Sequence, residues 1–339
     1  MAKKEGRSTV YHSGLTSEYE KIVSRENQKL ISEFARYLKS VDKSPQTISQ
    51  YEAQLKIWAV WNAKENDNTF FIDMKKRQFV QFFSYLQTDL EVSSNRICSF
   101  RAVLSSLSNF IERIMDDDYP TFRNIVKVLE PVNKTVVREK TVLSIEEVKE
   151  CLEALVAHKK YQAAAFLAVA ASSGARKAEL VQFKVSDFDE NHLIFNGAAY
   201  ETEPVRSKGR GRAGHVVSKI VFANMVDVKR YVDLLVANRQ SMGIYTNDLF
   251  VSSYGGTSRA TVSTANSFVA TIEKYLGKSV YSHAFRHLCC TYLLEIGIPK
   301  EVVQQIFRWK TDQVPTYDDR DKDKELANFM IEFNRKSLI

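Results

Sequence analysis

The residues from Tyr281 to Tyr317 read YSHAFRHLCCTYLLEIGIPKEVVQQIFRWKTDQVPTY, and this stretch carries the strongest chemical signal in the chain. His283 and Arg286 are three positions apart, so in a helix their side chains share one face and can converge on one anion. Tyr317 follows in a polar segment beside Pro315, where a core residue is not expected. A phenol in this position is a candidate nucleophile if a neighbouring group removes its proton.

A second stretch, SSGARKAEL at residues 172–180, adds another arginine. The guanidinium of Arg176 can fork onto two phosphate oxygens and stays charged, and Glu179 is placed to orient it. Taken alone, the pair is more simply an ion pair at the surface of a helix. The sequence contains neither a Walker-type phosphate loop nor a metal-ligand cluster. The two stretches together predict a phosphodiester that is held by positive charge and attacked by a side chain without a metal.

These residues resemble the motifs of the tyrosine site-specific recombinases, the phage-integrase family. Gly174–Leu180 resembles the first arginine box of that family, and His283–His287 resembles its His-x-x-Arg box. Ile306–Trp309 stands where the family has a Leu-Gly-His/Trp element, and Tyr317 stands at the place of the nucleophile. The resemblance extends from about Ser24 to the C-terminus. Each box alone is a weak signal, whereas the ordered set is specific.

The resemblance implies a catalytic set of Arg176, Lys208, His283, Arg286, Trp309 and Tyr317. Tyr317 would attack the scissile phosphate to form a 3′-phosphotyrosyl link, and Lys208 would protonate the leaving 5′-oxygen. The two arginines, the histidine and the tryptophan would stabilise the charge on the phosphoryl group. The covalent link conserves the energy of the broken bond, so we expect no cofactor, metal or ATP.

Some of these roles have competitors within the sequence. The expected hairpin at residues 201–214 carries three arginines besides Lys208, and Lys219 is a weaker candidate for the general acid. His287 could support Arg286 without acting itself. The indole of Trp309 can only donate a hydrogen bond, so it either contacts the phosphate or buttresses the tyrosine. Tyr292 and Tyr281 would be the next candidates for the nucleophile.

The hydrophobic pattern divides the chain into four parts. Residues 1–17 are polar and aperiodic and are predicted to form a flexible arm. Residues 18–130 repeat apolar side chains at three- and four-residue steps, and Ser44-Pro45 is a typical helix start. They resemble the family's helical core-binding (SAM-like) domain. Residues 131–140 are polar and basic and are interpreted as a linker. Residues 141–339 resemble the catalytic domain.

Within residues 141–339, a capping box at Ser144 and Glu147 predicts a helix start, and helices are expected to about residue 180. Short apolar runs at residues 193–195, 216–217 and 220–222 predict a small sheet. Helices are expected again at about 225–240, 261–276 and 284–309. Apolar residues at 326, 329, 330 and 333 predict a tail helix, and the resemblance implies that it docks on a neighbouring protomer. The fold class expected is therefore mostly α with a small antiparallel β-sheet, arranged as a two-domain, C-shaped DNA clamp of the tyrosine recombinase type.

Composition agrees with this interpretation without deciding it. The chain has 339 residues, a net charge of +7 and a pI near 9.0, which suits a polyanionic partner. There is no long apolar run of membrane-spanning type and no signal-peptide pattern. The four cysteines have no disulfide spacing, so a cytoplasmic location is expected. The implied partners are double-stranded DNA, further copies of the chain as a tetramer on paired DNA sites, and accessory DNA-bending proteins.

A different class of function fits most of the same residues. A recombinase-fold repressor or accessory protein would bind DNA but would not cut it. Two features motivate this alternative: Trp309 and Tyr317 are eight positions apart, one fewer than is common in the family, and the acidic residues Asp318 and Asp319 follow the tyrosine. An RNA-binding or purely structural helical protein would explain the basic charge but not the ordered motifs.

DNA binding is expected to depend steeply on salt. The basic residues at 131–140 and 201–214 imply several phosphate contacts, and each contact contributes about −0.9 to the slope of log K against log salt. Fluorescence anisotropy with a labelled duplex, repeated from low to moderate salt, measures this slope. A slope near zero would remove nucleic acid as the partner.

Overall fold

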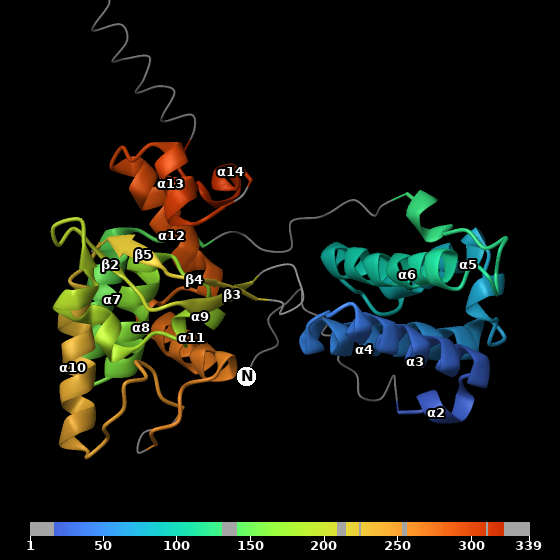
Figure 1. The fold of residues 1–339 in the computed structure, drawn as a ribbon, viewed down its shortest axis with the longest axis horizontal. Helices are drawn as coiled ribbons and strands as arrows, with labels where there is room; N and C mark the ends of the chain where they lie inside the picture. Colours follow the sequence, from blue (N-terminus) through green and yellow to red (C-terminus); the bar gives the residue numbers. More distant parts are fainter. Residues whose placement is uncertain are drawn as a thin grey trace, which may run out of the picture. The chain divides into compact units, whose positions relative to one another are not determined.

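The structure is a computed structural model that describes residues 17–130, 141–208, 215–223, 225–252, 256–309 and 311–321. The chain divides into two compact units (Figure 1), one of Met1–Glu139 with Gly209–His215 and the other of Lys140–Lys208 with Val216–Ile339. The predicted linker, nearly all of the predicted N-terminal arm and the predicted tail helix lie outside the described residues. Among the helices described, none is both long enough and apolar enough to cross a membrane.

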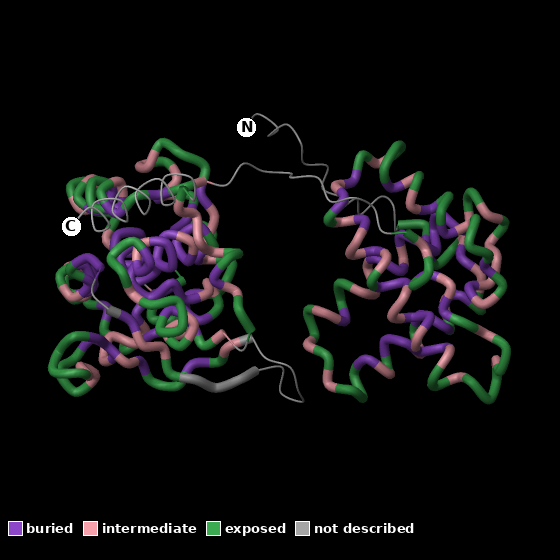
Figure 2. The backbone as a smooth tube through the Cα atoms, turned by 90° about the horizontal axis from the view of Figure 1, so that it is seen from above, coloured by how far each residue is buried: buried purple, intermediate pink, exposed green. Residues whose placement is uncertain are grey.

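Helices build the N-terminal unit. Its elements are α2 (Tyr19–Ile22), α3 (Arg25–Ser40), α4 (Pro45–Glu65), η1 (Phe71–Asp73), α5 (Lys76–Thr88), α6 (Ser94–Ile114) and η2 (Val126–Val128). The long helices α3 to α6 confirm the helical period of this part of the sequence. Buried positions recur along these helices (Figure 2). Their apolar faces meet in a core that includes Phe34, Trp58, Phe82 and Phe100, all at most 1% exposed.

The start of α4 shows how local sequence sets a helix boundary. The hydroxyl of Ser44 accepts a hydrogen bond from the backbone N–H of Thr47 at 3.2 Å, and Pro45 occupies the first helical position. Proline costs nothing there because its missing N–H would have no partner within the helix. At α7 (Ile145–Ala157), Ser144 and Glu147 form a reciprocal capping box with N–O distances of 3.2 and 3.0 Å. Both predicted helix starts are confirmed.

One buried helix organises the C-terminal unit. Its helices are α7 (Ile145–Ala157), α8 (Tyr161–Ser173), α9 (Lys177–Leu180), η3 (Val185–Phe188), η4 (Glu190–His192), α10 (Val228–Ser241), α11 (Val262–Leu276), α12 (Ser282–Glu295), α13 (Lys300–Ile306) and α14 (Val314–Tyr317). Every residue of α8 after the first is buried, and α8 contacts α7, α10, α11 and α12. Its alanine-rich sequence lets these neighbours approach closely, and its C-terminal end leads into the arginine box.

The helical segment expected at 284–309 is interrupted in the structure. Helix α12 ends at Glu295 and α13 begins only at Lys300. Gly297 has a positive φ of 86°, which glycine adopts without strain, and Pro299 precedes the next helix. This break turns the chain, so that residues after it lie against α12: both α13 and α14 contact α12.

A small antiparallel sheet completes the C-terminal unit. Its strands are β1 (Leu193–Ile194), β2 (Ala199–Glu201) and β5 (Val221–Ala223), and the hairpin β3 (Val205–Lys208) with β4 (His215–Ser218) lies between β2 and β5 in the chain. Tyr200 pairs with Phe222 across β2 and β5, and their rings stack at 5.8 Å. The predicted fold class, mostly α with a small antiparallel sheet, is confirmed. Strand β2 was not among the predicted strands.

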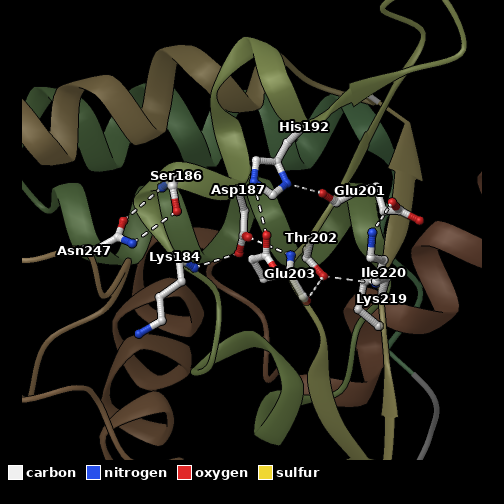
Figure 3. Close-up of polar contacts among 10 residues, drawn as sticks. All are labelled: Lys184, Ser186, Asp187, His192, Glu201, Thr202, Glu203, Lys219, Ile220 and Asn247. Carbon is white, nitrogen blue, oxygen red and sulfur yellow. Dashed lines mark hydrogen bonds and ion pairs between the residues drawn. The ribbon is translucent and has the colours of Figure 1, made fainter.

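A buried carboxylate joins the segment before the sheet to the end of β2 (Figure 3). The oxygens of Asp187 accept hydrogen bonds from the backbone N–H groups of Lys184 and Glu203, at 2.7 and 2.8 Å. Burial raises the pKa of Asp187, and the two backbone hydrogen bonds act in the opposite direction. His192 lies beside it, with its Nδ1 2.7 Å from the carbonyl oxygen of Glu201. These contacts tie the η3 and η4 segment to the end of β2, just before β3 in the chain.

Replacing Asp187 with alanine should destabilise the protein. The substitution leaves two inward-facing backbone N–H groups without acceptors, and an unsatisfied buried donor costs about 1–3 kcal/mol. Urea unfolding measures the loss. Glu190→Ala, at an exposed position of η4, is the matched control and should change the free energy of unfolding by less than about 0.5 kcal/mol. Equal effects of the two substitutions would contradict this role of Asp187.

Candidate active site

Gly174 allows the end of α8 to approach the C-terminal segment. It caps the helix with φ of +56°, in the left-handed region. A Cβ at this position would lie 2.4 Å from Cε1 of Phe307 and 3.1 Å from Cβ of Cys289. The missing side chain therefore leaves room for the ring of Phe307. The carbonyl oxygen of Gly174 accepts a buried hydrogen bond of 2.7 Å from Nη1 of Arg286.

Arg286 is a buried cation whose hydrogen-bonding capacity is only partly used among the described residues. It lies on α12 and is only 3% exposed. Of its guanidinium nitrogens, Nε and Nη2 are buried and have no hydrogen-bond partner among the described residues. Burial, and then the positive charge of nearby Arg176, lower the pKa of the Arg286 guanidinium. Because an arginine stays charged in proteins, a buried cation with unused donors is a strong site for an anion.

Three aromatic rings surround this guanidinium. Its central carbon lies 4.5 Å from the ring centroid of Phe307, 5.1 Å from that of Trp309 and 5.4 Å from that of Tyr317. The rings stack in turn, with centroids 4.6 Å apart for Phe307 and Trp309 and 5.0 Å apart for Trp309 and Tyr317. Cation–π attraction offsets part of the cost of burying the charge. The eight-residue step from Trp309 to Tyr317 is thus compatible with direct contact of their rings.

A buried glutamate orients Arg176. The backbone N–H of Arg176 donates to Oε2 of Glu179 at 2.7 Å, and its Nη1 donates to Oε1 at 3.0 Å. The same Oε1 accepts a hydrogen bond of 2.6 Å from the hydroxyl of Ser207 on β3. Glu179 is 3% exposed at its side chain, whereas Arg176 is 33% exposed. The pair is therefore not an ordinary surface ion pair, and part of the guanidinium remains open to a ligand.

His283 lies in the first turn of α12 and is exposed to solvent. Its pKa is lowered from the ordinary value, first because neighbouring protein atoms remove part of its hydration and then because Arg286 and Arg176 add positive charge. A lowered pKa keeps the imidazole mainly neutral near pH 7. In that state one ring nitrogen can accept a proton while the other can donate a hydrogen bond.

Of the two lysines considered as the general acid, only Lys219 has a described side chain. Lys208 is the last residue of β3, and its side chain lies outside the described residues. The hydrogen bond from its neighbour Ser207 to Glu179 places this end of β3 beside the arginine box. Lys219, the competitor, forms an ion pair with Glu201 at 2.9 Å (Figure 3).

Five of the six residues singled out by the sequence have described side chains, and four of them gather around the fifth, Arg286. Arg286 is in contact with the rings of Trp309 and Tyr317 and interacts electrostatically with Arg176 and His283. Sequence reasoning missed Phe307, although an aromatic residue two positions before Trp309 was a usable signal. It also missed Thr291, which contacts the tyrosine segment, and it considered Asp319 only as a negative charge beside the phenol.

The comparisons with known proteins cover both units. Residues 141–322, more than half of the chain, match the model of the Phage integrase family. The SPbeta prophage-derived recombinase-like protein YomM of Bacillus subtilis (strain 168) is 29% identical over 313 residues, which are 89% of this chain and 90% of that protein.

Two solved structures show the same fold at low sequence identity. The Tn1549 transposon integrase (residues 82–397) in complex with circular intermediate DNA is 15% identical, covers 89% of this chain and 98% of its own, and has a TM-score of 0.63. A lambda integrase (residues 75–356) dimer bound to a COC′ core site is also 15% identical, covers 86% and 95%, and has a TM-score of 0.61. With the family match over residues 141–322, these findings place the chain in the phage integrase family of tyrosine recombinases.

Proposed function

We propose that this protein is a site-specific DNA recombinase that cuts and rejoins duplex DNA through a covalent link to Tyr317. The observation that carries the proposal is the buried guanidinium of Arg286, which has two unused N–H donors and lies against the Tyr317 ring. A phosphodiester bound to those donors would be held next to the phenol. The family membership of the chain supports the same conclusion.

Two guanidinium groups would bind the scissile phosphate. The free Nε and Nη2 of Arg286 form a fork that matches two nonbridging oxygens. Arg176 is held by Glu179 and would add a second charged donor from the other side. These donors are fixed before the substrate arrives, so they can stabilise the additional negative charge of the transition state without rearranging. Trp309 would complete the wall beside them and could donate its indole N–H.

The proposed reaction exchanges one phosphoester for another. The hydroxyl oxygen of Tyr317 attacks phosphorus, and the bond from phosphorus to the 5′-oxygen breaks. His283 is mainly neutral at pH 7 and would accept the phenol proton. Lys208 would donate a proton to the leaving 5′-oxygen. Attack by a 5′-hydroxyl on the 3′-phosphotyrosyl link reverses these steps and rejoins the strand.

The proposed partners are duplex DNA and further copies of the chain. The structures with the same fold include a lambda integrase dimer bound to a core site and a lambda integrase tetramer bound to a Holliday junction. By analogy, we propose that this chain assembles as a homotetramer on paired DNA sites. Accessory DNA-bending proteins stay a prediction from the sequence.

The non-catalytic alternative loses support from contacts around the tyrosine. The short step between Trp309 and Tyr317 still brings their rings to 5.0 Å. The Asp318 carboxylate accepts two hydrogen bonds of 2.9 Å from the guanidinium of Arg320, and Asp319 lies beside His287. The two acidic residues therefore have cationic or ionisable neighbours that reduce their effect on the phenol.

Replacing Arg176 with lysine should separate binding from cleavage. Lysine keeps the positive charge but loses the bidentate fork, so DNA affinity should change little. The loss of one such transition-state donor typically lowers a rate by about 10²–10³. Single-turnover cleavage at saturating DNA measures the effect. If Arg176→Lys cleaved at the parental rate, Arg176 would have only a structural role beside Glu179.

Replacing Tyr317 with phenylalanine tests the function itself. The substitution removes one oxygen and keeps the stacked ring, so folding and DNA binding should survive. The probe is a duplex selected from random-sequence DNA by binding to the full chain, then nicked at successive positions so that a cleaved strand cannot be rejoined. The parent should form a covalent protein–DNA adduct on denaturing gels, and Tyr317→Phe should form none.

Tyr292→Phe, on α12, is the matched control and should retain the adduct. If the parent bound the selected DNA without ever forming an adduct, the protein would be a recombinase-fold DNA-binding protein. An adduct formed by Tyr317→Phe would place the nucleophile elsewhere.

A further inference from the structure

The short helix that carries Tyr317 needs support from outside itself. Helix α14 has four residues, Val314–Tyr317, and a single helical turn is not stable on its own in water. Its stability must come from packing against other elements, and α12 and α13 are in contact with it. The contacts that the segment Tyr317–Asp319 makes with α12 therefore decide where the phenol lies.

Thr291 on α12 forms hydrogen bonds with the backbone on both sides of Asp318. Its hydroxyl donates a hydrogen bond of 3.2 Å to the carbonyl oxygen of Tyr317 and accepts one of 3.0 Å from the backbone N–H of Asp319. Thr291 is 7% exposed. One buried hydroxyl thus satisfies a donor and an acceptor at the point where the chain leaves α14.

His287, one helical turn before Thr291, contacts the same segment through its ring. Its Nδ1 lies 3.0 Å from Oδ2 of Asp319, and both side chains are largely buried. The two atoms are close but are not aligned as a hydrogen bond, since Nδ1 has no such partner among the described residues. The His287 ring also lies 4.7 Å from the Tyr317 ring, centroid to centroid. His287 therefore contacts the phenol ring and also faces the carboxylate two residues after it.

We propose that His287, Thr291 and Asp319 form a clasp that positions Tyr317 for attack on DNA. These residues act on Tyr317 and on the backbone beside it rather than on the guanidinium of Arg286, so they are positioning residues rather than catalytic ones. Thr291 holds the backbone of the tyrosine segment. His287 contacts the ring of Tyr317 and lies beside the carboxylate of Asp319, and this pairing directs that carboxylate away from the phenol. This inference rests on the proposed function, because it assigns a purpose to the placement of the nucleophile.

A matched pair of substitutions tests the backbone contact. Thr291→Val keeps the shape of the side chain but removes its hydroxyl, whereas Thr291→Ser keeps the hydroxyl. At saturating nicked duplex, selected as above, Thr291→Val should form the covalent adduct about 10- to 100-fold more slowly, since a misplacement of about 1 Å can cost 10²-fold in rate. Thr291→Ser should recover most of the rate. DNA affinity should stay within about twofold for both, because Thr291 is buried and its hydroxyl is bonded to the tyrosine segment.

A double-mutant cycle tests the side-chain contact. His287→Gln and Asp319→Asn should each slow adduct formation, and the double variant should be little slower than the slower single variant, because residues in contact are not additive. Glu301→Gln, at an exposed position of α13, is the control for loss of a carboxylate and should react at the parental rate. Thermal melting of each variant separates slow chemistry from unfolding.

The outcomes distinguish the clasp from the function on which it rests. A parent that forms no adduct overturns the proposed function. A parent that forms the adduct, with clasp variants that are folded and equally fast, overturns the clasp alone. The clasp is also overturned if the two losses in the cycle multiply, or if Thr291→Ser is as slow as Thr291→Val.

Discussion

The whole candidate site depends on the burial of one positive charge. The guanidinium of Arg286 is almost inaccessible, yet only its bond to the Gly174 carbonyl satisfies it within the described protein. Burying such a charge costs free energy unless other contacts compensate for it. The rings of Phe307, Trp309 and Tyr317 supply part of that compensation. The remaining donors stay unused, which we interpret as the capacity reserved for a phosphate.

This arrangement explains why segments far apart in the chain must meet. Position 174, the C-cap of α8, requires glycine because a side chain there would clash with the ring of Phe307. Helix α12 then serves as a shared support: Arg286 faces the end of α8, and Thr291 reaches the segment after α14. The break at Gly297 lets the chain return along α12. The binding groups and the proposed nucleophile are therefore positioned by the same helix.

Local signals were sufficient to predict much of this structure. The serine caps at Ser44 and Ser144, the apolar period of the N-terminal helices and the motif residues around Arg176 and Arg286 are all visible in the sequence. The contacts that join them are not, because they link positions separated by many residues. The packing of Gly174 against Phe307 and the approach of His287 to Asp319 follow from tertiary structure. Strand β2 was missed because its residues, Ala199, Tyr200 and Glu201, include no β-branched side chain, whereas the predicted runs contain isoleucine or valine.

The central claim is that the phenol held beside Arg286 becomes bonded to DNA. Mass spectrometry of the parental covalent complex, after digestion with nuclease and protease, tests it most directly. The account predicts that the nucleotide phosphate is attached through its 3′-oxygen to the peptide that contains Tyr317. Attachment to any other residue, or a DNA end linked through its 5′-oxygen, would contradict it.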